Sequence, residues 1–190
     1  MSKTKLLDLL EEINPAEYII YCDLDGVLVD FDKGYEEITG KRTHHTDRQG
    51  SQYFWDLYRQ GLKDKGMTER EYWENLPWMK DGKQMWDYIK SYNPFVLTAP
   101  SVNPEIPKPE RYKISHNESM QGKTEWVKRL DNMRAIKFKA SNFKKHLAKP
   151  NRILIDDRKP TIEQWRAKGG IGIHHTSAQD TINQLKKLGL

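Results

Sequence analysis

The chain has 190 residues, of which 36% are hydrophobic and 31% are charged, and its formal net charge is +5. No apolar run approaches the ~20 residues that a membrane-spanning helix needs, and the single cysteine, Cys22, excludes an internal disulfide framework. Residues 1–12 carry too much charge for a signal peptide. We therefore expect a cytoplasmic protein with no membrane partner, built as one domain or as a core domain with an insertion.

The positive charge is concentrated in the middle of the chain. Between Pro104 and Pro150 there are twelve Lys or Arg residues but five Asp or Glu residues. A basic section suits an anionic substrate such as a phosphate or a nucleotide. Charge alone, however, favours an ordinary solvated surface, so the function has to be argued from other residues.

The first regular element is expected at residues 4–13, an amphipathic helix that ends at Asn14-Pro15. An apolar, β-prone run follows from Tyr18 to Cys22. Such a run is typical of a buried parallel strand. It leads directly into Asp23-Leu24-Asp25-Gly26, so polar chemistry begins where this strand ends.

Asp23 and Asp25 lie on the same side of an extended chain, because side chains alternate along a strand. Gly26 permits a sharp change of direction after them. In an open α/β sheet, ligands bind at the carboxyl ends of the strands. Burial of two unpaired carboxylates would be costly, so we expect a metal ion or a positively charged partner nearby.

Residues 31–92 show no strand signals and are rich in aromatic side chains. We interpret 31–92 as a small helical cap inserted between the first two core strands, with 1–30 and 93–190 as the core. The expected helices run from Phe31 to Gly40, from a Ser51 cap to Gly61, from Glu69 to Leu76 with a Thr68/Glu71 capping box, and near Asp81 to Tyr92.

Strand signals return after the helical section and alternate with helices. Strands are expected at residues 95–98, 135–139, 153–155 and 171–174. Four prolines make residues 100–109 a loop. This alternation predicts an α/β protein with a Rossmann-like, doubly wound parallel sheet. Four helices are expected in this half of the chain. Two of them cover residues 123–132 and 142–148, a third begins at Pro160, and a fourth follows a cap at Ser177.

Polar residues end three of the expected strands: Asp23 with Asp25, Thr98, and Asp156 with Asp157. Carboxylates from two strand ends form a hard-oxygen site suited to Mg²⁺. A carboxylate can also attack phosphorus as a nucleophile, and a second one can transfer protons. The pattern therefore indicates metal-assisted phosphoryl chemistry.

Four segments carry a family resemblance. In chain order, D-L-D-G-V-L, F-V-L-T, G-K-T-E-W-V and I-L-I-D-D-R resemble the four motifs of the haloacid dehalogenase (HAD) superfamily phosphatases. The fuller pattern D-G-V-L-V-D-F, T-A-P, G-K-T-E-W-V and L-I-D-D-R is similar to the 5′(3′)-deoxyribonucleotidase family, including its phage and bacterial members. The resemblance covers about residues 18–189.

The resemblance implies a role for each catalytic position. Asp23 would be the nucleophile and a Mg²⁺ ligand, and Asp25 the general acid and base whose backbone carbonyl also binds the metal. Thr98 would hydrogen-bond the phosphoryl group. Lys123 would neutralise the nucleophile and the phosphate.

The same resemblance implies the metal and substrate contacts. Asp156 would ligate Mg²⁺, with Asp157 in support through water. Phe31 falls where the family stacks the nucleobase. Ala99 departs from the Ser that usually follows the Thr of the second motif, so one phosphate contact is missing from the pattern.

Alternatives remain for several residues. Lys139, Lys144 and Lys145 also precede the last motif and could replace Lys123 as the phosphate-site lysine. The tryptophans of residues 31–92 suit a hydrophobic core better than base stacking, although one or two could face the cleft. The six histidines show no convincing metal-ligand spacing.

The expected activity is Mg²⁺-dependent dephosphorylation of nucleoside 5′- or 3′-monophosphates, with deoxyribonucleosides favoured, by a monomer or homodimer. Phosphorylated nucleic-acid ends and sugar phosphates are alternative substrates, with nucleic acid less favoured than a small phosphomonoester. A non-catalytic phosphate-binding module is a third alternative. Intact Asp23, Asp25, Lys123 and Asp156 argue against it, because a binder has no evident need for both carboxylates.

Overall fold

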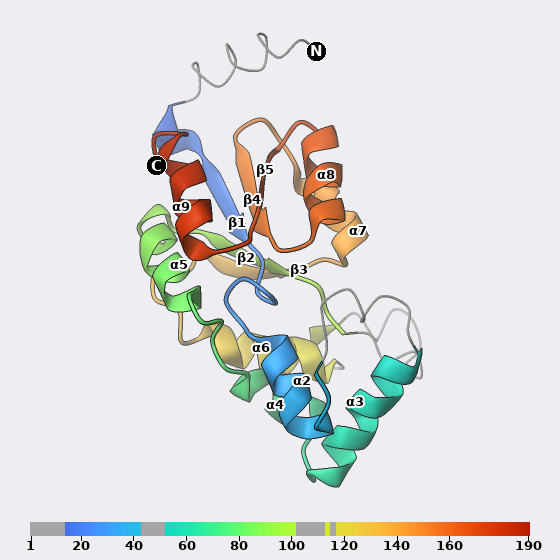
Figure 1. The fold of residues 1–190 in the computed structure, drawn as a ribbon. Helices are drawn as coiled ribbons and strands as arrows, with labels where there is room; N and C mark the ends of the chain where they lie inside the picture. The colour runs from blue at the N-terminus through green and yellow to red at the C-terminus, as the bar shows by residue number, and fades with distance from the viewer. Residues whose placement is uncertain (1–13, 43–51, 102–112, 115–116) are drawn as a thin grey trace.

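The computed structural model describes residues 14–42, 52–101, 113–114 and 117–190 (Figure 1). The helix predicted at 4–13, the Ser51 cap and most of the loops predicted at 41–50 and 100–109 lie outside the described residues.

A five-stranded parallel sheet forms the centre of the molecule. Its strand order is β3-β2-β1-β4-β5, with β1 in the middle. All four neighbouring pairs are parallel, so the predicted doubly wound sheet is confirmed. The strands are β1 (Ile19–Cys22), β2 (Phe95–Thr98), β3 (Ala135–Phe138), β4 (Arg152–Asp156) and β5 (Ile171–His174).

Helices cover the sheet and fill the connection between β1 and β2. In Figure 1, α5 and α9 lie side by side, whereas α2, α3 and α4 lie together at the other end of the molecule. The α-helices are α2 (Phe31–Thr39), α3 (Gln52–Asp64), α4 (Glu69–Asn75), α5 (Gly82–Ile89), α6 (Glu118–Val127), α7 (Ser141–Lys144), α8 (Lys159–Ala167) and α9 (Ala178–Lys186), and the 3₁₀ helices are η1 (Pro15–Glu17), η2 (Lys90–Tyr92) and η5 (Lys145–Leu147).

The alternation of side chains along β1 divides the core between the two faces of the sheet. Ile20 and Cys22 belong to the larger hydrophobic cluster, which includes side chains of α5, α6 and α9. Tyr21 points the other way and packs in a smaller cluster with Ile162 and Trp165 of α8. Both faces are covered, which explains why β1 reads as a continuous apolar run.

Helix α3 does not end at Gly61 as predicted, but continues to Asp64. A side chain at Gly61 would place its Cβ 2.8 Å from the backbone oxygen of Ile38 in α2. The glycine therefore serves close packing between α2 and α3 and does not terminate the helix.

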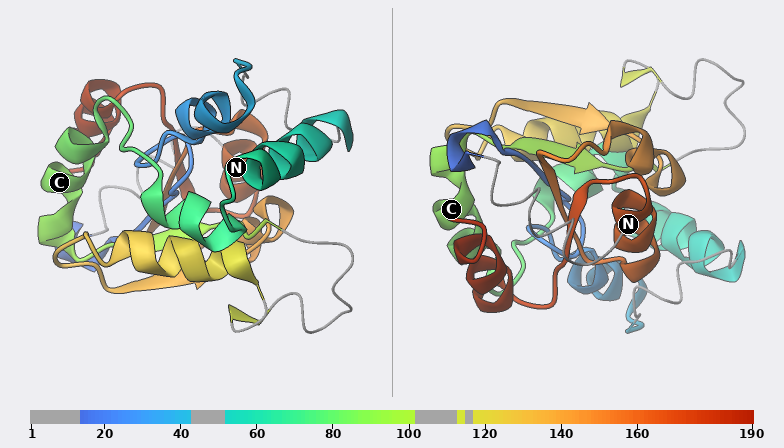
Figure 2. Two further views of the ribbon diagram at one scale, coloured as in Figure 1. Left: turned by 90° about the horizontal axis from the view of Figure 1, so that it is seen from below. Right: turned by 90° about the horizontal axis from the view of Figure 1, so that it is seen from above.

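Helix α4 is joined closely to α6. The predicted capping box of α4 is confirmed, with Thr68 and Glu71 bonding to each other's backbone N–H groups. The Glu118 carboxylate at the start of α6 accepts from the backbone nitrogen of Glu69 at 3.0 Å. At Gly122, a Cβ would lie 2.4 Å from a backbone oxygen of α4. Figure 2 shows α6, in yellow, beside β3, so α4 is attached to a helix that covers the sheet.

Helix α6 also begins earlier than predicted. It starts at Glu118, because the Asn117 side chain accepts a hydrogen bond from the backbone nitrogen of Met120 and caps the helix. Lys123, predicted to open this helix, therefore lies in its middle.

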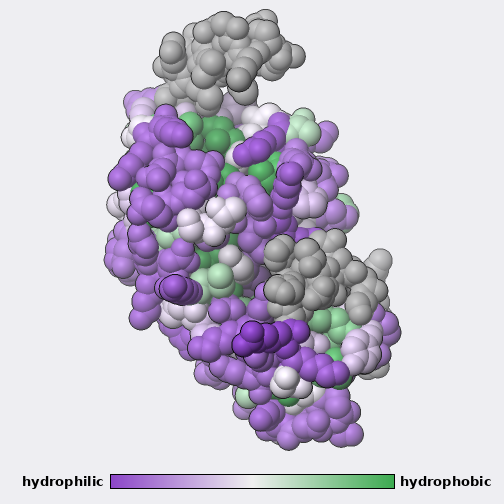
Figure 3. Space-filling view, viewed as in Figure 1, coloured by the Kyte–Doolittle hydropathy of each residue, from purple (hydrophilic) through white to green (hydrophobic). Residues whose placement is uncertain are grey.

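Among the described residues, no helix is both long and apolar enough to cross a membrane. The face in Figure 3 is mostly hydrophilic, with smaller hydrophobic areas between the polar side chains. The division into a core and a cap over residues 31–92 stays a prediction.

Candidate active site

The predicted site residues meet at one edge of the sheet. Asp23 follows β1, Thr98 ends β2 and Asp156 ends β4. Since β1 lies between β2 and β4 and all three are parallel, these three strand ends are neighbours. Asp23 is 5% exposed, and Thr98 and Asp156 are fully buried. The site is therefore a polar cluster enclosed by the carboxyl ends of the central strands.

Three carboxylates are placed to bind one cation. Ligand atoms of Asp23, Asp156 and Asp157 all lie within 4.8 Å of one another. Asp156 is held in place because its Oδ1 accepts a hydrogen bond of 2.9 Å from the backbone nitrogen of Arg158. Hard oxygen donors at this spacing fit a divalent cation such as Mg²⁺. The side chain of Asp25, whose predicted metal contact is its carbonyl, is not part of this group.

Gly26 lets the loop after β1 fold back onto Asp157. Its φ is +75°, and a Cβ there would lie 2.3 Å from the Asp157 Oδ2 atom. A residue with a side chain would both strain the backbone and displace this carboxylate. Gly26 therefore has the predicted role of a turn residue and, in addition, leaves room for the Asp157 carboxylate.

Lys144 is the lysine beside Asp23. Its Nζ lies 2.7 Å from Asp23 Oδ2 and 2.7 Å from Asp156 Oδ2, and the side chain is 1% exposed. The sequence offers Lys144 as an alternative to Lys123, and in the structure Lys144 makes the contact with Asp23 that the resemblance implies for Lys123. The ammonium group bridges carboxylates from two neighbouring strands.

The electrostatics of this cluster leave an excess of negative charge. Burial raises the pKa of the Asp23 carboxyl well above its usual range, Lys144 counteracts this, and Asp156 adds to it. Burial alone would lower the pKa of Lys144, but the two carboxylates raise it above its ordinary value. One ammonium therefore offsets only part of the charge of the carboxylates, which is the situation that a bound cation would relieve.

Lys123 contacts the second carboxylate instead. Its buried Nζ lies 2.6 Å from Asp25 Oδ2, 2.7 Å from the carbonyl oxygen of Ala99 and 3.1 Å from Thr98 Oγ1. The ammonium also lies 4.2 Å from the ring centre of Trp73 in α4. Asp25 Oδ1 is buried and accepts no hydrogen bond from any described residue. Lys123 thus joins Asp25 to the end of β2.

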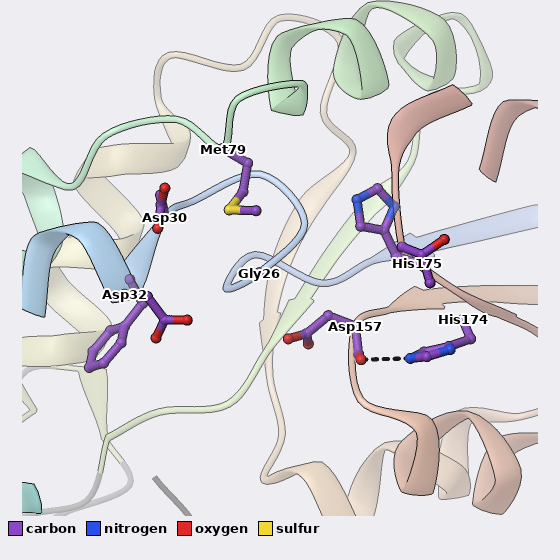
Figure 4. Close-up of a pocket in the computed structure, with 9 residues that line it drawn as sticks. Gly26, Asp30, Asp32, Met79, Asp157, His174 and His175 are labelled. Atoms are coloured by element: carbon purple, nitrogen blue, oxygen red, sulfur yellow. Dashed lines mark hydrogen bonds between the residues drawn. The ribbon is translucent and has the colours of Figure 1, made fainter. Parts of the chain in front are cut away.

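A cavity of about 360 Å³ adjoins the carboxylates. Figure 4 shows Asp157 and Gly26 between Asp32 on one side and the two histidines, His174 and His175, on the other, with the Asp157 carboxylate pointing toward that of Asp32. The Asp157 carbonyl oxygen lies 2.9 Å from His174 Nε2. The lining residues are Gly26, Asp30, Phe31, Asp32, Met79, Asp157, His174, His175 and Thr176.

Phe31 lines this cavity but offers it little surface. Its side chain is 1% exposed, and its ring packs against those of Tyr35, Phe54, Tyr58, Tyr72 and Trp73 at centroid distances of 5.1 to 6.2 Å. In this structure the ring predicted to stack a nucleobase belongs to an aromatic core. Base stacking by Phe31 stays a proposal.

Sequence reasoning missed several residues near the site. His174 ends β5 and His175 follows it, and the motifs gave neither histidine a role. Trp73 contacts Lys123 from α4 and is 4% exposed. Burial raises the pKa of the Glu69 carboxyl, and a hydrogen bond from Trp73 and the positive charge of Lys123 oppose this rise. Trp73 is one of the tryptophans of residues 31–92 for which a position facing the cleft stays open in the sequence. For Glu69 the available signal is helical spacing, since it lies four residues before Trp73 and on the same side of α4.

Comparison with solved structures identifies the fold. A HAD-superfamily hydrolase of subfamily IA from Geobacter sulfurreducens matches 90% of this chain and 97% of its own, with 11% identity and a TM-score of 0.50. A HAD-like family protein from Streptococcus pneumoniae matches 90% of this chain and 91% of its own, with 15% identity and a TM-score of 0.49. A Bacillus subtilis protein described as a HAD hydrolase bound to magnesium matches 88% of this chain and 98% of its own, with 10% identity and a TM-score of 0.49.

No protein-family model and no curated protein matches the chain. The first of the three structures shows that the chain has the Rossmann-like fold of HAD-superfamily hydrolases, as its motifs predicted. The closer resemblance to nucleotidases rests on the motifs alone.

Proposed function

We propose that the protein is a phosphomonoesterase that forms an aspartyl-phosphate on Asp23. The observation that carries this proposal is the grouping of Asp23 with two further carboxylates and the buried Lys144 at one sheet edge. A metal and an ammonium beside a carboxylate lower the charge repulsion between that carboxylate and an incoming phosphate. An ordinary structural ion pair has no need of three clustered carboxylates.

In the first step, an Asp23 carboxylate oxygen attacks phosphorus, and the bond from phosphorus to the alcohol oxygen breaks. Asp25 gives its proton to the departing oxygen. The Oδ1 atom of Asp25 suits this role because no described residue bonds to it. Lys123, bonded to Oδ2, fixes the orientation of the carboxyl group.

In the second step, water attacks the phosphorus of the aspartyl-phosphate and Asp25 accepts its proton. The bond between Asp23 and phosphorus breaks, which releases inorganic phosphate and regenerates both carboxyl groups. Thr98 Oγ1 accepts a hydrogen bond from Lys123, so the Thr98 hydroxyl would donate its own proton to a phosphoryl oxygen. The Lys123 ammonium, whose three N–H groups bond to Asp25, Thr98 and Ala99, would supply positive charge beside the phosphate.

The residues that would hold Mg²⁺ are Asp23, Asp156 and Asp157, with the Asp25 carbonyl as the further predicted ligand. When bound, the ion supplies positive charge that offsets the charge of the phosphate and of the nucleophile.

The proposed substrates are nucleoside 5′- or 3′-monophosphates, with deoxyribonucleotides favoured. Two observations support this class. The motifs resemble those of deoxyribonucleotidases, and the cavity lies next to a cluster of aromatic side chains that includes Phe31. Aromatic faces suit nucleobases.

The test is phosphate release from a panel of nucleoside monophosphates, sugar phosphates and 3′-phosphorylated oligonucleotides, with Mg²⁺ or EDTA. The variants are Asp23→Asn and, as a control, the exposed Asp64→Asn. We expect turnover of mononucleotides that needs Mg²⁺, is abolished by Asp23→Asn and is unchanged by Asp64→Asn. Turnover only of sugar phosphates would reject the nucleotide assignment, and turnover that survives Asp23→Asn would reject the mechanism.

A further inference from the structure

The chain between Asp131 and Asp156 contains seven Lys or Arg residues and no Asp or Glu. It forms β3, α7, η5 and most of β4. One of the seven, Lys144, belongs to the candidate active site. The other six have no role there: Arg134, Lys137, Lys139, Lys145, Lys149 and Arg152.

Three of these cations lie over two stacked aromatic rings. Tyr21 in β1 and Phe95 in β2 have ring centroids 5.1 Å apart and an interplanar angle of 13°. Arg134 Cζ lies 5.1 Å from the Phe95 centroid, and Lys137 Nζ lies 4.5 Å from it. Arg152 Cζ lies 5.9 Å from the Tyr21 centroid. Attraction to the ring faces holds these cations close together on one part of the sheet.

No carboxylate among the described residues offsets the charge of this group. Neither Arg134, Lys137 nor Arg152 forms an ion pair with another described residue. Arg152 Nη1 donates to the carbonyl oxygen of Leu147 at 2.8 Å, but its buried Nε has no partner in the described part of the chain. Like charges that converge without carboxylates create a positive potential that attracts a polyanion.

An exposed aromatic side chain lies on the same stretch of chain. Phe143 in α7 is 54% exposed, and its ring centroid lies 5.8 Å from that of His146. Phe143 directly precedes Lys144 of the active site, and η5 then leads to the Leu147 carbonyl that Arg152 contacts. Cations beside an exposed aromatic ring are the combination that single-stranded nucleic acids recognise, through phosphates and base stacking respectively.

We propose that a basic face, formed by Arg134, Lys137, Lys145, Lys149, Arg152 and Phe143, binds single-stranded nucleic acid. The phosphates would contact the cations, and one base would stack on Phe143. The bound strand would then lie next to the active site, because Lys144 separates Phe143 from Lys145. This proposal goes beyond the proposed function and does not depend on it, since binding requires none of the catalytic carboxylates.

The test is fluorescence anisotropy with a labelled single-stranded oligodeoxynucleotide over a series of salt concentrations. The variant Arg134→Gln/Lys137→Gln should bind about tenfold more weakly. The negative slope of log K against log salt should become shallower by about 1.4, because each of the two lost phosphate contacts contributes about −0.7 for single strands. The control Lys186→Gln/Lys187→Gln removes the same charge at the end of α9 and should change the affinity less than about twofold.

A second variant tests the stacking contact separately. Phe143→Ala should weaken binding about fivefold and leave the salt slope unchanged, because it removes no charge. Absence of oligonucleotide binding, equal losses in both double variants, or equally tight binding of polyglutamate or phosphatidylserine vesicles would overturn the proposal.

Mononucleotide turnover by the same variants separates this proposal from the proposed function. Weak oligonucleotide binding by Arg134→Gln/Lys137→Gln with unchanged mononucleotide turnover is the expected result. Specific oligonucleotide binding by a protein without phosphatase activity would support the basic face and reject the proposed function.

Discussion

The ammonium group of Lys123 lies 4.2 Å from the centre of the Trp73 ring, so a helix from residues 31–92 contacts the polar cluster directly. The same ammonium bonds to Asp25, Thr98 and the Ala99 carbonyl. Trp73 itself is fixed, because its Nε1 lies 3.4 Å from Glu69 Oε1 and its Cβ faces Gly122 of α6. Trp73 therefore helps to position the lysine that orients Asp25.

Replacement of Trp73 should affect proton transfer through Lys123 and Asp25. Loss of a buried cation–π interaction costs about 1–2 kcal/mol, so we expect Trp73→Leu to lower kcat/KM about tenfold. Trp73→Phe keeps an aromatic face and should lose less. The decrease should be larger for alkyl phosphates, whose departing oxygen needs a proton, than for p-nitrophenyl phosphate. An equal decrease for both substrates would indicate a structural effect and contradict the positioning role.

Lys144→Met should destabilise the protein when no metal is bound. The change leaves Asp23 and Asp156 buried without their shared ammonium, and removal of one partner from a buried ion pair costs about 3–5 kcal/mol. The Tm in EDTA should therefore fall clearly, and added Mg²⁺ should restore part of it.

The neighbouring Lys145→Met is the matched control, because Lys145 forms no ion pair with a described residue and should tolerate the change. If Lys144→Met melted at the same temperature as the unchanged protein in EDTA, the electrostatic account of the site would be wrong.

The local features of the fold could be predicted from the sequence. The apolar runs before Asp23 and Asp156 identified β1 and β4, and Thr68 with Glu71 identified the start of α4. These signals lie within a few neighbouring residues. From these signals the ends of β1 and β4 could be located in the sequence. Because the two strands are parallel neighbours in the sheet, their ends bring Asp23, Asp156 and Asp157 together.

Features that depend on distant packing could not be predicted. Lys123 and Lys144 both precede the last motif, and only the arrangement of α6 and α7 decides that Lys144 contacts Asp23. Gly61 resembled a helix end, although its role is contact with Ile38. Phe31 falls at the expected motif position, but aromatic side chains from α2, α3 and α4 bury its ring.

His175 should make stability depend on pH. Burial lowers the pKa of its imidazole, His174 acts in the same direction, and Asp81 opposes it. The folded state therefore keeps His175 neutral while the unfolded state takes up a proton below about pH 6.5. The stability that His175 contributes is complete above that pH and is lost as the pH falls toward its folded pKa.

His175→Asn should reduce the fall in Tm between pH 7 and pH 5, because Asn cannot titrate and keeps a hydrogen-bonding group for Thr181. The exposed His146→Gln is the control and should leave the fall in Tm unchanged. An identical fall in Tm for His175→Asn and the unchanged protein would assign the pH dependence to other groups.

Gly26→Ala and Gly40→Ala separate backbone strain from displacement of a metal ligand. Both glycines have a positive φ, +75° and +67°, so each Ala should cost about 1 kcal/mol of stability. Only at Gly26 would the new Cβ meet Asp157, 2.3 Å from its Oδ2, whereas nothing lies within 4 Å at Gly40. We therefore expect Gly26→Ala to lose at least about tenfold in activity and most of the rise in Tm that Mg²⁺ produces. Gly40→Ala should keep both, and equal behaviour of the two variants would show that the position of Asp157 does not matter for the site.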